Sequence, residues 1–314
     1  MNPLTGLFRA GLTLRNTLFD KRILPSRRLD QPVISVGNLS VGGSGKTPFV
    51  IALGELLSQR GIRFDVLSRG YLRKTRGMRI VHAAGTASEF GDEPLLIARR
   101  LNVPVVVGES RYEAGRLAEE KFDSELHILD DGFQHRSLAR DFDIVLLAAE
   151  DLSDRLLPSG RLREPFSSLK RADAIVLPRD VPADHAAFSG KPIWRMHRGL
   201  SLQGAPPNPI VFCGIARPRQ FFSQLRSLGI SPLEEVVFRD HHAYSRADIG
   251  LLETVRQERG AGGFIATEKD AVNLGPHLSA LAPLAVIPVK MELSDADNAV
   301  DTMLSKIAER RRNA

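Results

Sequence analysis

A strand-like run that breaks into glycines and ends in Gly-Lys-Thr is the most constraining feature of this chain. Val33–Val36 is rich in β-branched residues, glycines follow at positions 42, 43 and 45, and Phe49–Leu57 has a helix-like composition. This order is typical of a phosphate-binding loop, in which backbone N–H groups surround phosphate oxygens at the start of a helix. Lys46 would place a positive charge on the β- and γ-phosphates, and the Thr47 hydroxyl is suited to Mg²⁺.

The loop departs from the strict pattern at one position. That pattern has glycine at position 40, where this chain has Ser40. We expect the Gly42-Gly43 pair to supply the missing flexibility, because glycine adopts positive φ without a steric penalty. The residues predicted to bind the nucleotide are Ser40, Val41, Gly42, Gly43, Ser44, Gly45, Lys46 and Thr47.

Short apolar runs alternate with helical segments on either side of this loop. The expected strands are Gln31–Val36, Arg63–Leu67, Pro104–Val107, Leu126–Leu129, Asp143–Leu147 and Ala174–Leu177, and the expected helices are Pro48–Gln59, Pro94–Leu101 and Arg111–Lys121. Buried β-branched strands separated by helices indicate a parallel sheet with helices on both faces. The predicted fold class is α/β, with a P-loop NTPase-like parallel-sheet domain and a second, smaller α/β domain.

The chain of 314 residues exceeds the usual size of one domain. A proline-rich stretch at 204–209 marks a boundary, after which the alternation of strands and helices restarts. We therefore predict a first domain over 1–192 that carries the phosphate-binding loop and includes an amphipathic helix within about its first 28 residues. A linker over 193–209 and a smaller α/β domain over 210–314 would follow. The single cysteine, Cys213, excludes an internal disulfide and fits a reducing compartment.

The N-terminal segment is basic and amphipathic. Residues 4–19 place apolar side chains at spacings of three and four, with Arg9 and Arg15 between them. Such a helix is too short and too charged to span a bilayer, and we expect no signal peptide because an apolar core and a cleavage site are lacking. Two interpretations remain open: the helix lies in a membrane interface with its arginines among anionic headgroups, or its apolar face packs on the protein's own core.

Positive charge also gathers between Arg60 and Arg79, in addition to the six basic residues within 1–28. Such clusters attract polyanions, which include nucleic acid, phosphorylated substrates and anionic membranes. The basic clusters show no interleaved aromatic stacking platform, so a nucleic-acid partner is disfavoured.

The strand Leu126–Leu129 runs directly into Asp130-Asp131. A carboxylate that emerges at the carboxyl end of a parallel strand beside a phosphate-binding loop is suited to support Mg²⁺. Paired aspartates at strand ends also occur as plain turn residues, but the Gly-Lys-Thr sequence upstream favours the metal-supporting interpretation.

Two further segments carry charged residues suited to phosphoryl transfer. Asp92 precedes Pro94 at a predicted helix start, where it would either cap the helix or accept a proton from an attacking hydroxyl. Arg163 and Glu164 lie in a compact loop, where the arginine would stabilise a transferring phosphoryl group and the glutamate would support metal or orient Arg163. A simple surface ion pair is the alternative for this loop.

The predicted smaller domain holds two more motifs. Asp240-His241-His242 follows a strand, and one histidine is expected to face the cleft between the domains. The segment Thr267-Glu268-Lys269-Asp270 differs from a guanine-specificity signature by one position, so we interpret it as a helix-capping or interdomain segment.

In this order, the segments Asn38–Pro48, Gly91–Pro94, Asp130–His135, Leu162–Pro165, Asp240–His242 and Thr267–Asp270 resemble the tetraacyldisaccharide 4′-kinase family. The family's loop also lacks the first glycine, so Ser40 agrees with the resemblance. The resemblance implies Mg²⁺-dependent transfer of the γ-phosphate of ATP to the 4′-hydroxyl of an acylated disaccharide 1-phosphate lipid, giving lipid IVA in lipid A biosynthesis. It also implies peripheral attachment to the cytoplasmic face of the bacterial inner membrane.

The resemblance further implies a role for each motif residue. Asp92 would be the general base with His241 as its partner, and Lys46 and Thr47 would hold phosphate and Mg²⁺. Thr47 and Asp130 would be the metal ligands, and Asp131, Arg163 and Glu164 would complete the catalytic set around the reacting phosphate. The alternative is a protein of another class, a P-loop regulatory GTPase or metallochaperone that acts as a nucleotide-switched binding module. Only the phosphate-binding loop supports that alternative.

Overall fold

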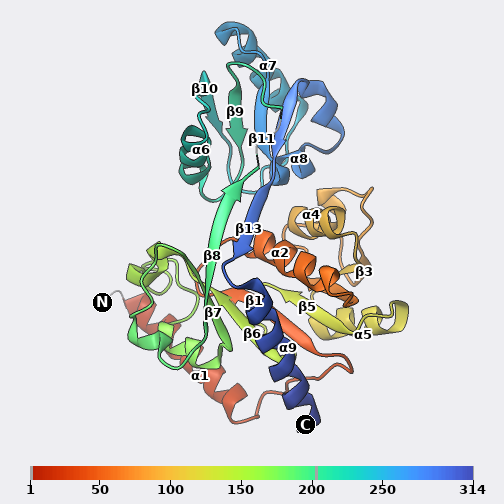
Figure 1. Cartoon of the computed structure of the whole chain (residues 1–314), viewed down its shortest axis with the longest axis vertical. Coiled ribbons are helices and arrows are strands. Elements are labelled where there is room, and N and C mark those ends of the chain that lie inside the picture. Colours follow the sequence, from red (N-terminus) through yellow and green to blue (C-terminus); the bar gives the residue numbers. More distant parts are fainter. Residues whose placement is uncertain (1–2, 202–203, 314) are drawn as a thin grey trace.

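The computed structural model describes residues 3–201 and 204–313. Within these ranges the chain forms a nine-stranded sheet with the order β13-β8-β7-β6-β1-β5-β2-β4-β3 and a separate four-stranded sheet with the order β10-β9-β11-β12 (Figure 1). The smaller sheet is parallel throughout, and the larger one has antiparallel pairs only where β3 meets β4 and β13 meets β8, among the described residues. The predicted α/β fold class is confirmed.

The elements associated with the larger sheet span most of the chain. Its strands are β1 (Val33–Asn38), β2 (Phe64–Ser68), β3 (Arg79–Ile80), β4 (Val105–Val107), β5 (Leu126–Asp130), β6 (Phe142–Leu146), β7 (Ala174–Pro178), β8 (Ile193–Leu200) and β13 (Val289–Leu293). Its helices are α1 (Pro3–Asp20), α2 (Lys46–Gln59), α3 (Ala87–Phe90), α4 (Asp92–Leu101), α5 (Arg111–Lys121) and α9 (Ala296–Arg312), with 3-10 turns at η1 (Ala149–Ser153), η2 (Phe166–Arg171) and η3 (Ala186–Phe188).

The smaller sheet has a shorter set of elements. Its strands are β9 (Ile210–Cys213), β10 (Glu234–Val237), β11 (Phe264–Thr267) and β12 (Leu284–Ile287), and its helices are α6 (Pro218–Ser227), α7 (Arg246–Arg259) and α8 (Glu268–Leu274), followed by the 3-10 turn η4 (Gly275–Leu281).

Both faces of the larger sheet are buried, because successive strand residues point to opposite sides. Ile34 and Val36 of β1 join a core formed with α2, α4 and α9, whereas Val33 joins a second core formed with α5. Every residue of β1 is buried. The resulting helix–sheet–helix layering carries the loop after β1 to the carboxyl edge of the sheet, where the loops after β2, β5 and β6 also emerge.

The two sheets are joined by a two-stranded ribbon. The first half of β8 pairs with β7, and its second half pairs with β13 as the two strands rise toward the smaller sheet (Figure 1). The linker expected over 193–209 therefore differs from the structure in its first half. Trp194 and Met196 are buried in the core of the larger sheet, and the proline-rich stretch at 204–209 begins only after β8 ends.

The C-terminal elements also return to the larger sheet. Val300, Met303 and Ile307 of α9 are buried in the same core as α2, and Arg310 contacts Asp173 with two hydrogen bonds of 2.7 and 2.8 Å. We therefore propose a larger domain formed by residues 3–200 and 289–313, with residues 204–288 as an inserted smaller domain, in place of a single smaller domain over 210–314.

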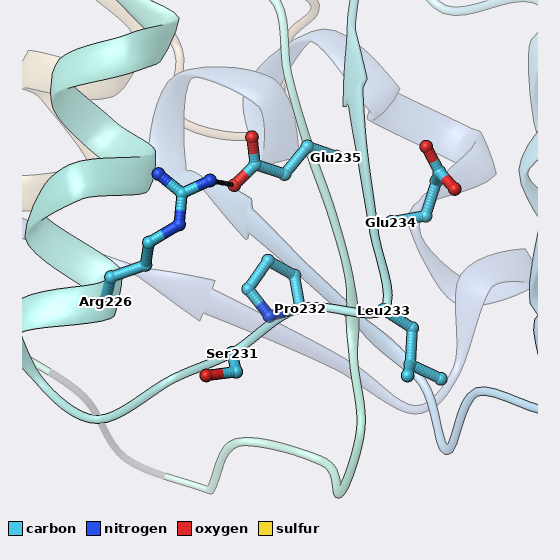
Figure 2. Close-up of a pocket in the computed structure, with 6 residues that line it drawn as sticks. All are labelled: Arg226, Ser231, Pro232, Leu233, Glu234 and Glu235. Carbon is cyan, nitrogen blue, oxygen red and sulfur yellow. Dashed lines mark hydrogen bonds and ion pairs between the residues drawn. The ribbon is translucent and has the colours of Figure 1, made fainter.

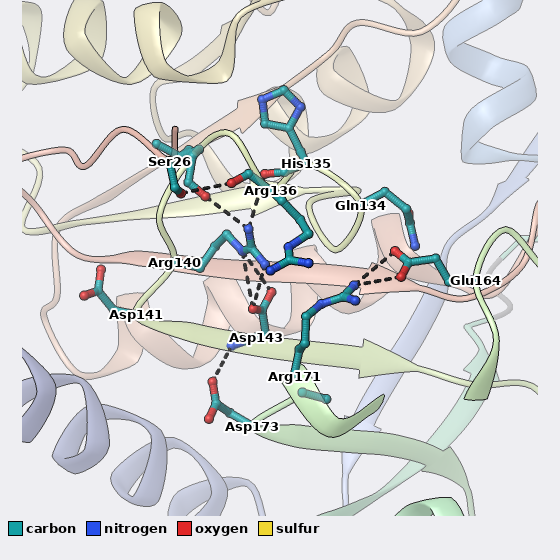
Figure 3. A network of polar contacts seen from close by, with 12 residues as sticks. Ser26, Gln134, His135, Arg136, Arg140, Asp141, Asp143, Glu164, Arg171 and Asp173 are labelled. Carbon is teal, nitrogen blue, oxygen red and sulfur yellow. Dashed lines mark hydrogen bonds and ion pairs between the residues drawn. The ribbon is translucent and has the colours of Figure 1, made fainter. Parts of the chain in front are cut away.

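A charged network extends from the amino ends of β6 and β7 to the segment that carries Glu164. Figure 3 shows Arg140 against Asp143 and Arg171 against Glu164, with the Asp143 backbone N–H donating to Asp173. These contacts hold the start of β6 against the residue before β7 and fix the segment between Glu164 and Arg171, because a buried charge that lacks a partner is strongly unfavourable.

A second buried charge group joins β2 to β5. The His127 side chain is fully buried and contacts the Asp65 carboxylate through Nδ1 at 2.8 Å and Glu119 through Nε2 at 3.4 Å. Burial lowers the pKa of His127, but the hydrogen bonds and charges of the two carboxylates outweigh it and raise the pKa above 6.5.

Replacement of His127 by Leu is expected to lower the free energy of unfolding by about 3 kcal/mol, because Asp65 then stays buried without its partner. A raised folded-state pKa adds stability that is complete below the unfolded pKa and is lost as pH rises through the folded pKa. The wild type should lose the stability that comes from protonated His127 as the pH rises above about 6.5. The variant has no imidazole at this position and should show no such loss. Urea unfolding at several pH values measures both effects. His82→Leu, at an exposed histidine, is the matched control. Equal stability of the two variants would contradict the role of His127 as the partner of the buried Asp65.

Candidate active site

The loop after β1 has the backbone geometry of a phosphate cradle. Gly45 adopts φ +83° as the residue before α2, and Gly42 adopts φ +96°. A Cβ atom at Gly45 would overlap the methyl carbon of Met291, and one at Gly43 would lie 3.3 Å from the Cβ of Ala216. The Ser44 hydroxyl is buried without a hydrogen-bond partner in the described part of the chain. Only glycine fits at position 45, which explains the sequence pattern there.

The loop is tied to the segment that carries Arg163. The Val41 N–H donates to the Arg161 carbonyl at 2.8 Å, and the Arg163 N–H donates to the Leu39 carbonyl at 2.6 Å. Ser40 pairs with Leu162 in an isolated antiparallel bridge. The departure from glycine at position 40 is therefore accommodated, because this residue is held as an extended bridge residue and needs no positive φ.

A first charged cluster forms around Asp131. Arg163 donates to both carboxylate oxygens of Asp131 at 2.8 and 3.0 Å, and the Lys46 ammonium lies 3.5 Å from the same group. Lys46 and Arg163 both also donate to the Asn38 side-chain oxygen. Burial raises the pKa of Asp131, but the charges of Lys46 and Arg163 outweigh it and hold the pKa well below its usual range. Asp131 therefore stays ionised and orients two cations at the phosphate cradle.

The neighbouring Asp130 has the opposite environment. Its Oδ2 accepts a hydrogen bond of 3.0 Å from Ser68, and its buried Oδ1 has no partner among the described residues. Burial, together with the charges of Glu93 and Asp131, raises the pKa of Asp130 to about 7. An orphaned carboxylate oxygen with excess negative charge nearby fits a divalent cation that prefers oxygen ligands, and the buried Thr47 is the second residue of α2, in its first turn. The residues present thus fit Mg²⁺.

A second cluster forms where the smaller sheet meets α4. Asp92, the first residue of α4, accepts hydrogen bonds from His241 Nδ1 at 2.8 and 3.0 Å and from Asn273 at 3.1 Å. The Lys269 ammonium lies 3.8 Å from Asp92, 3.4 Å from Glu93 and 3.1 Å from His241 Nε2. Three side chains from the smaller domain therefore converge on one buried carboxylate of the larger domain.

The protonation of this second cluster follows from its contacts. Lys269 only donates, so its contact requires His241 Nε2 to accept and places the imidazole proton on Nδ1, toward Asp92. Burial raises the pKa of Asp92, yet the hydrogen bond from His241 and the charge of Lys269 outweigh it and lower the pKa. Burial lowers the pKa of His241, yet the hydrogen bond to Asp92 and its charge raise it. Asp92 is thus a carboxylate at neutral pH, beside a group able to take up a proton.

The structure brings most of the predicted site residues together in two groups. Lys46, Asp131 and Arg163 form the first group and Asp92 and His241 the second, with the Glu93 charge acting on both Asp130 and Lys269. One histidine of the pair at 241–242 is expected to face the cleft, and His241 is the one that contacts Asp92 of the larger domain. The other, His242, lies 3.1 Å from Asp248 within the smaller domain.

Glu164 lies apart from the reacting groups. Its fully buried carboxylate accepts hydrogen bonds of 2.9 and 3.0 Å from Arg171 (Figure 3). It also accepts one of 3.1 Å from Asn16 of α1. The prediction that Glu164 orients Arg163 differs from this geometry, because Arg163 pairs with Asp131.

Lys269 and Asn273 were missed as site residues. Thr267 caps α8 by accepting a hydrogen bond from Asp270 N, as the helix-capping interpretation of this segment predicts. The same cap begins α8, and Lys269 and Asn273, four positions apart, lie on one face of that helix and both reach Asp92.

A shallow pocket on the smaller domain lies away from these groups. Figure 2 shows it beside the edge strand β10, with an ion pair between Arg226 and Glu235. The remaining lining residues are Ser231, Pro232, Leu233 and Glu234, none of which the sequence predicts to carry chemistry.

Comparisons with known proteins agree with this geometry. The family model described as tetraacyldisaccharide-1-P 4′-kinase matches residues 1–308. A tetraacyldisaccharide 4′-kinase from Koribacter versatilis is 50% identical over 99% of both chains, and one from Aquifex aeolicus is 45% identical over 77% of this chain and 82% of its own. The crystal structure of LpxK from Aquifex aeolicus in complex with ATP superposes with a TM-score of 0.78 at 37% identity, covering 97% of each chain.

Replacement of Gly45 by Ala is expected to weaken ATP binding by roughly tenfold or more, because the new methyl group displaces Met291 and turns N–H groups away from a charged acceptor. Gly61→Ala is the matched control, since Gly61 has φ +72° but no atom within 4 Å of the position that a Cβ would take. Calorimetric titration with ATP should separate the two: the control loses stability through backbone strain and keeps its affinity. Equal affinities for the two variants would refute the cradle assignment.

Proposed function

This chain belongs to the tetraacyldisaccharide-1-P 4′-kinase family, and from that membership we propose how its own residues perform the family's reaction. The chain is an ATP-dependent kinase of lipid A biosynthesis that phosphorylates the 4′-hydroxyl of tetraacyldisaccharide 1-phosphate. The contact between Asp92 and His241, made across the two domains, carries the assignment of residue roles. The alternative of a regulatory GTPase or metallochaperone is not favoured by these matches.

We assign the donor half of the reaction to the loop and strand ends of the larger domain. Residues 40–47 would surround the phosphates of ATP, with Lys46 as the point charge on the β- and γ-phosphates. Thr47 and Asp130 would hold Mg²⁺, which when bound neutralises charge on the phosphate oxygens. The unpartnered Oδ1 of Asp130 supports this role.

Arg163 is proposed to stabilise the transferring phosphoryl group, with Asp131 as its positioning partner. The bidentate contact fixes the guanidinium plane, and a fixed donor needs no reorganisation when charge develops on the phosphoryl oxygens. Lys46 shares the same carboxylate, so Asp131 sets the spacing between the two cations.

The acceptor half is proposed to depend on Asp92. A sugar hydroxyl has a very high pKa, so positioning and charge neutralisation matter more than base strength in a loose phosphoryl-transfer transition state. The Asp92 carboxylate would orient the 4′-hydroxyl and accept its proton as the 4′-oxygen bonds to the γ-phosphorus and the bond from that phosphorus to the departing ADP breaks. His241 and Lys269 would stabilise the carboxylate until then.

Glu164 is proposed as a positioning residue that joins the N-terminal helix to the site. It bonds Asn16 of α1 on one side and Arg171 on the other, and the preceding residue in the chain is Arg163. Loss of Glu164 would release α1 and shift the segment that carries Arg163.

We propose that α1 docks on an anionic membrane at the cytoplasmic face of the inner membrane. No residue of Pro3–Asp20 is buried, and Leu7 and Leu14 are 73% and 62% exposed on one side of the helix. Arg15 and Asn16 on the other side bond Gln134 and Glu164. Leu7 and Leu14 are therefore directed away from the protein's own core, whereas Phe8, Leu12, Leu18 and Phe19 of the same helix are half-buried. None of the described helices is long and apolar enough to cross a bilayer.

Asp92→Asn is expected to lower kcat by about a hundred- to ten thousandfold, the usual contribution of a positioned proton acceptor. The dissociation constant for ATP should stay unchanged, because Asp92 belongs to the acceptor half. Transfer of radiolabel from ATP to the acylated disaccharide measures kcat, and calorimetry measures ATP affinity. Asp123→Asn, an exposed carboxylate 92% accessible at its side chain, is the control; wild-type turnover of Asp92→Asn would remove this residue from the mechanism.

Replacement of Leu7 and Leu14 together by Gln is expected to lower the partition coefficient onto vesicles containing anionic phospholipid by about tenfold or more, because two large apolar side chains no longer enter the interface. Co-sedimentation with vesicles provides the measurement. A double Gln variant at the exposed Leu228 and Leu251 of the smaller domain controls for loss of surface apolarity. Unchanged partition of the α1 variant would exclude α1 as the docking element.

A further inference from the structure

Two arginines outside the predicted site lie beside the phosphate cradle. Arg217 follows β9 in the smaller domain, and its Cγ lies 3.8 Å from the position that a Cβ would take at Gly43. Ala216, the preceding residue, covers Gly42 and Gly43 at 4.0 and 3.3 Å from the corresponding positions. The loop between β9 and α6 therefore lies directly over the glycines of the cradle.

Arg198 approaches the cradle from the ribbon. It stands directly opposite Met291 in the antiparallel pairing of β8 with β13, and directly opposed residues project to the same face of such a pair. Met291 packs its methyl group on Gly45, the last residue before α2. The side chains of Arg198 and Met291 are therefore neighbours on the face that meets the loop.

The charge of these two arginines is poorly balanced. Arg198 donates to the neutral Gln220 at 3.2 Å, and its buried Nε has no partner among the residues the structure describes. Arg217 pairs with Glu150 of η1 at 3.0 Å, and that carboxylate is 57% exposed. Burial, together with the positive charge of Arg217, lowers the pKa of Arg198. The two guanidinium groups repel each other, and the exposed Glu150 is the one carboxylate within residues 3–201 and 204–313 that pairs with them. Such a site is suited to a multivalent anion.

We propose that Arg198 and Arg217 contact the phosphate groups of ATP bound at residues 40–47 and so supply a phosphate-binding pair from the ribbon and the smaller domain. The inference rests on the proposed function in one respect, that the nucleotide lies in this cradle. Arg217 exchanges its solvent-exposed partner Glu150 for a phosphate oxygen when ATP binds.

The pair has a consequence for the acceptor half of the site. Gly214, three residues before Arg217, accepts a hydrogen bond of 3.1 Å from the His241 N–H and donates one of 2.7 Å to Asp270. His241 in turn bonds Asp92. A short and hydrogen-bonded segment therefore joins the phosphate-contacting Arg217 to the residue that orients the proposed base.

The test measures binding, not turnover. Arg217→Ala and Arg198→Gln should each weaken MgATP binding by roughly ten- to a hundredfold, the value of a charge-assisted hydrogen bond. Inorganic tripolyphosphate, used as a competitor of a fluorescent ATP analogue, should lose affinity by a similar factor. Arg217→Lys should retain part of the affinity because the point charge remains. Arg219→Ala, an equal change of charge two residues away at an exposed position, should leave both affinities unchanged.

Glu150→Gln separates phosphate contact from a purely structural ion pair. If Arg217 binds phosphate, loss of the competing carboxylate should tighten ATP binding by up to about fivefold. If Arg217 acts only by holding the domains together through Glu150, then Glu150→Gln should weaken binding as Arg217→Ala does, and the proposal is wrong. Loss of ATP affinity with unchanged tripolyphosphate affinity would also overturn it, because the contact would then be to the base or ribose.

Lys46→Ala distinguishes failure of this inference from failure of the proposed function. Lost ATP binding in Lys46→Ala with wild-type binding in Arg198→Gln and Arg217→Ala would refute the arginine pair alone. Wild-type ATP binding in Lys46→Ala would place the nucleotide elsewhere and refute both. Thermal melts monitored by circular dichroism confirm folding of each variant, and Arg217→Ala keeps the test decisive if Arg198→Gln, in the partly buried ribbon, unfolds.

Discussion

The contact between the two domains depends on the buried carboxylate of Asp92. Asp92 begins α4 with little exposure to solvent, and an ionised carboxylate in such a place is unfavourable unless several donors surround it. The larger domain provides the Glu93 N–H, and the other donors, His241 and Asn273, come from the smaller domain with the Lys269 charge behind them. The ionised form of Asp92 is therefore stabilised mainly where the two domains meet, so the arrangement of the domains and the charge of this carboxylate have one physical cause.

Two adjacent aspartates show how the same residue type acquires different tasks from its surroundings. Asp131, between Lys46 and Arg163, is held ionised and orients cations, whereas Asp130, buried beside Glu93 with one oxygen unpartnered, binds its proton more tightly. Environments that push the pKa values of neighbouring carboxylates apart mark their separate roles. A divalent cation at Asp130 would supply the positive charge that the protein does not.

Local patterns in the sequence were sufficient for the elements that carry their own signal. The loop around Gly45 was predicted because positive φ restricts the residue type, and β1 and β5 because both faces of these strands are buried. The ribbon was missed because β8 has no continuous apolar pattern: only Trp194 and Met196 are buried, and its second half pairs with a strand that comes much later in the chain, as the register of Met291 with Arg198 shows. Lys269 and Asn273 were missed because their role depends on where α8 docks, which no local pattern determines.

The N-terminal helix α1, the proposed membrane-docking element, is joined by hydrogen bonds to the end of β1 that carries the phosphate-binding loop. An amphipathic helix normally turns its apolar side to the core, yet α1 holds the protein with polar contacts: Arg15 to the Gln134 carbonyl, Asn16 to Glu164, and Arg136 to Asp20 at 2.7 Å. Gln134 in turn donates to the Asn38 carbonyl at the end of β1. The same short chain of hydrogen bonds that leaves Leu7 and Leu14 outward therefore ends at the phosphate cradle, so a helix lying in a lipid interface would hold the donor site at a fixed depth relative to a substrate whose acyl chains remain in the bilayer.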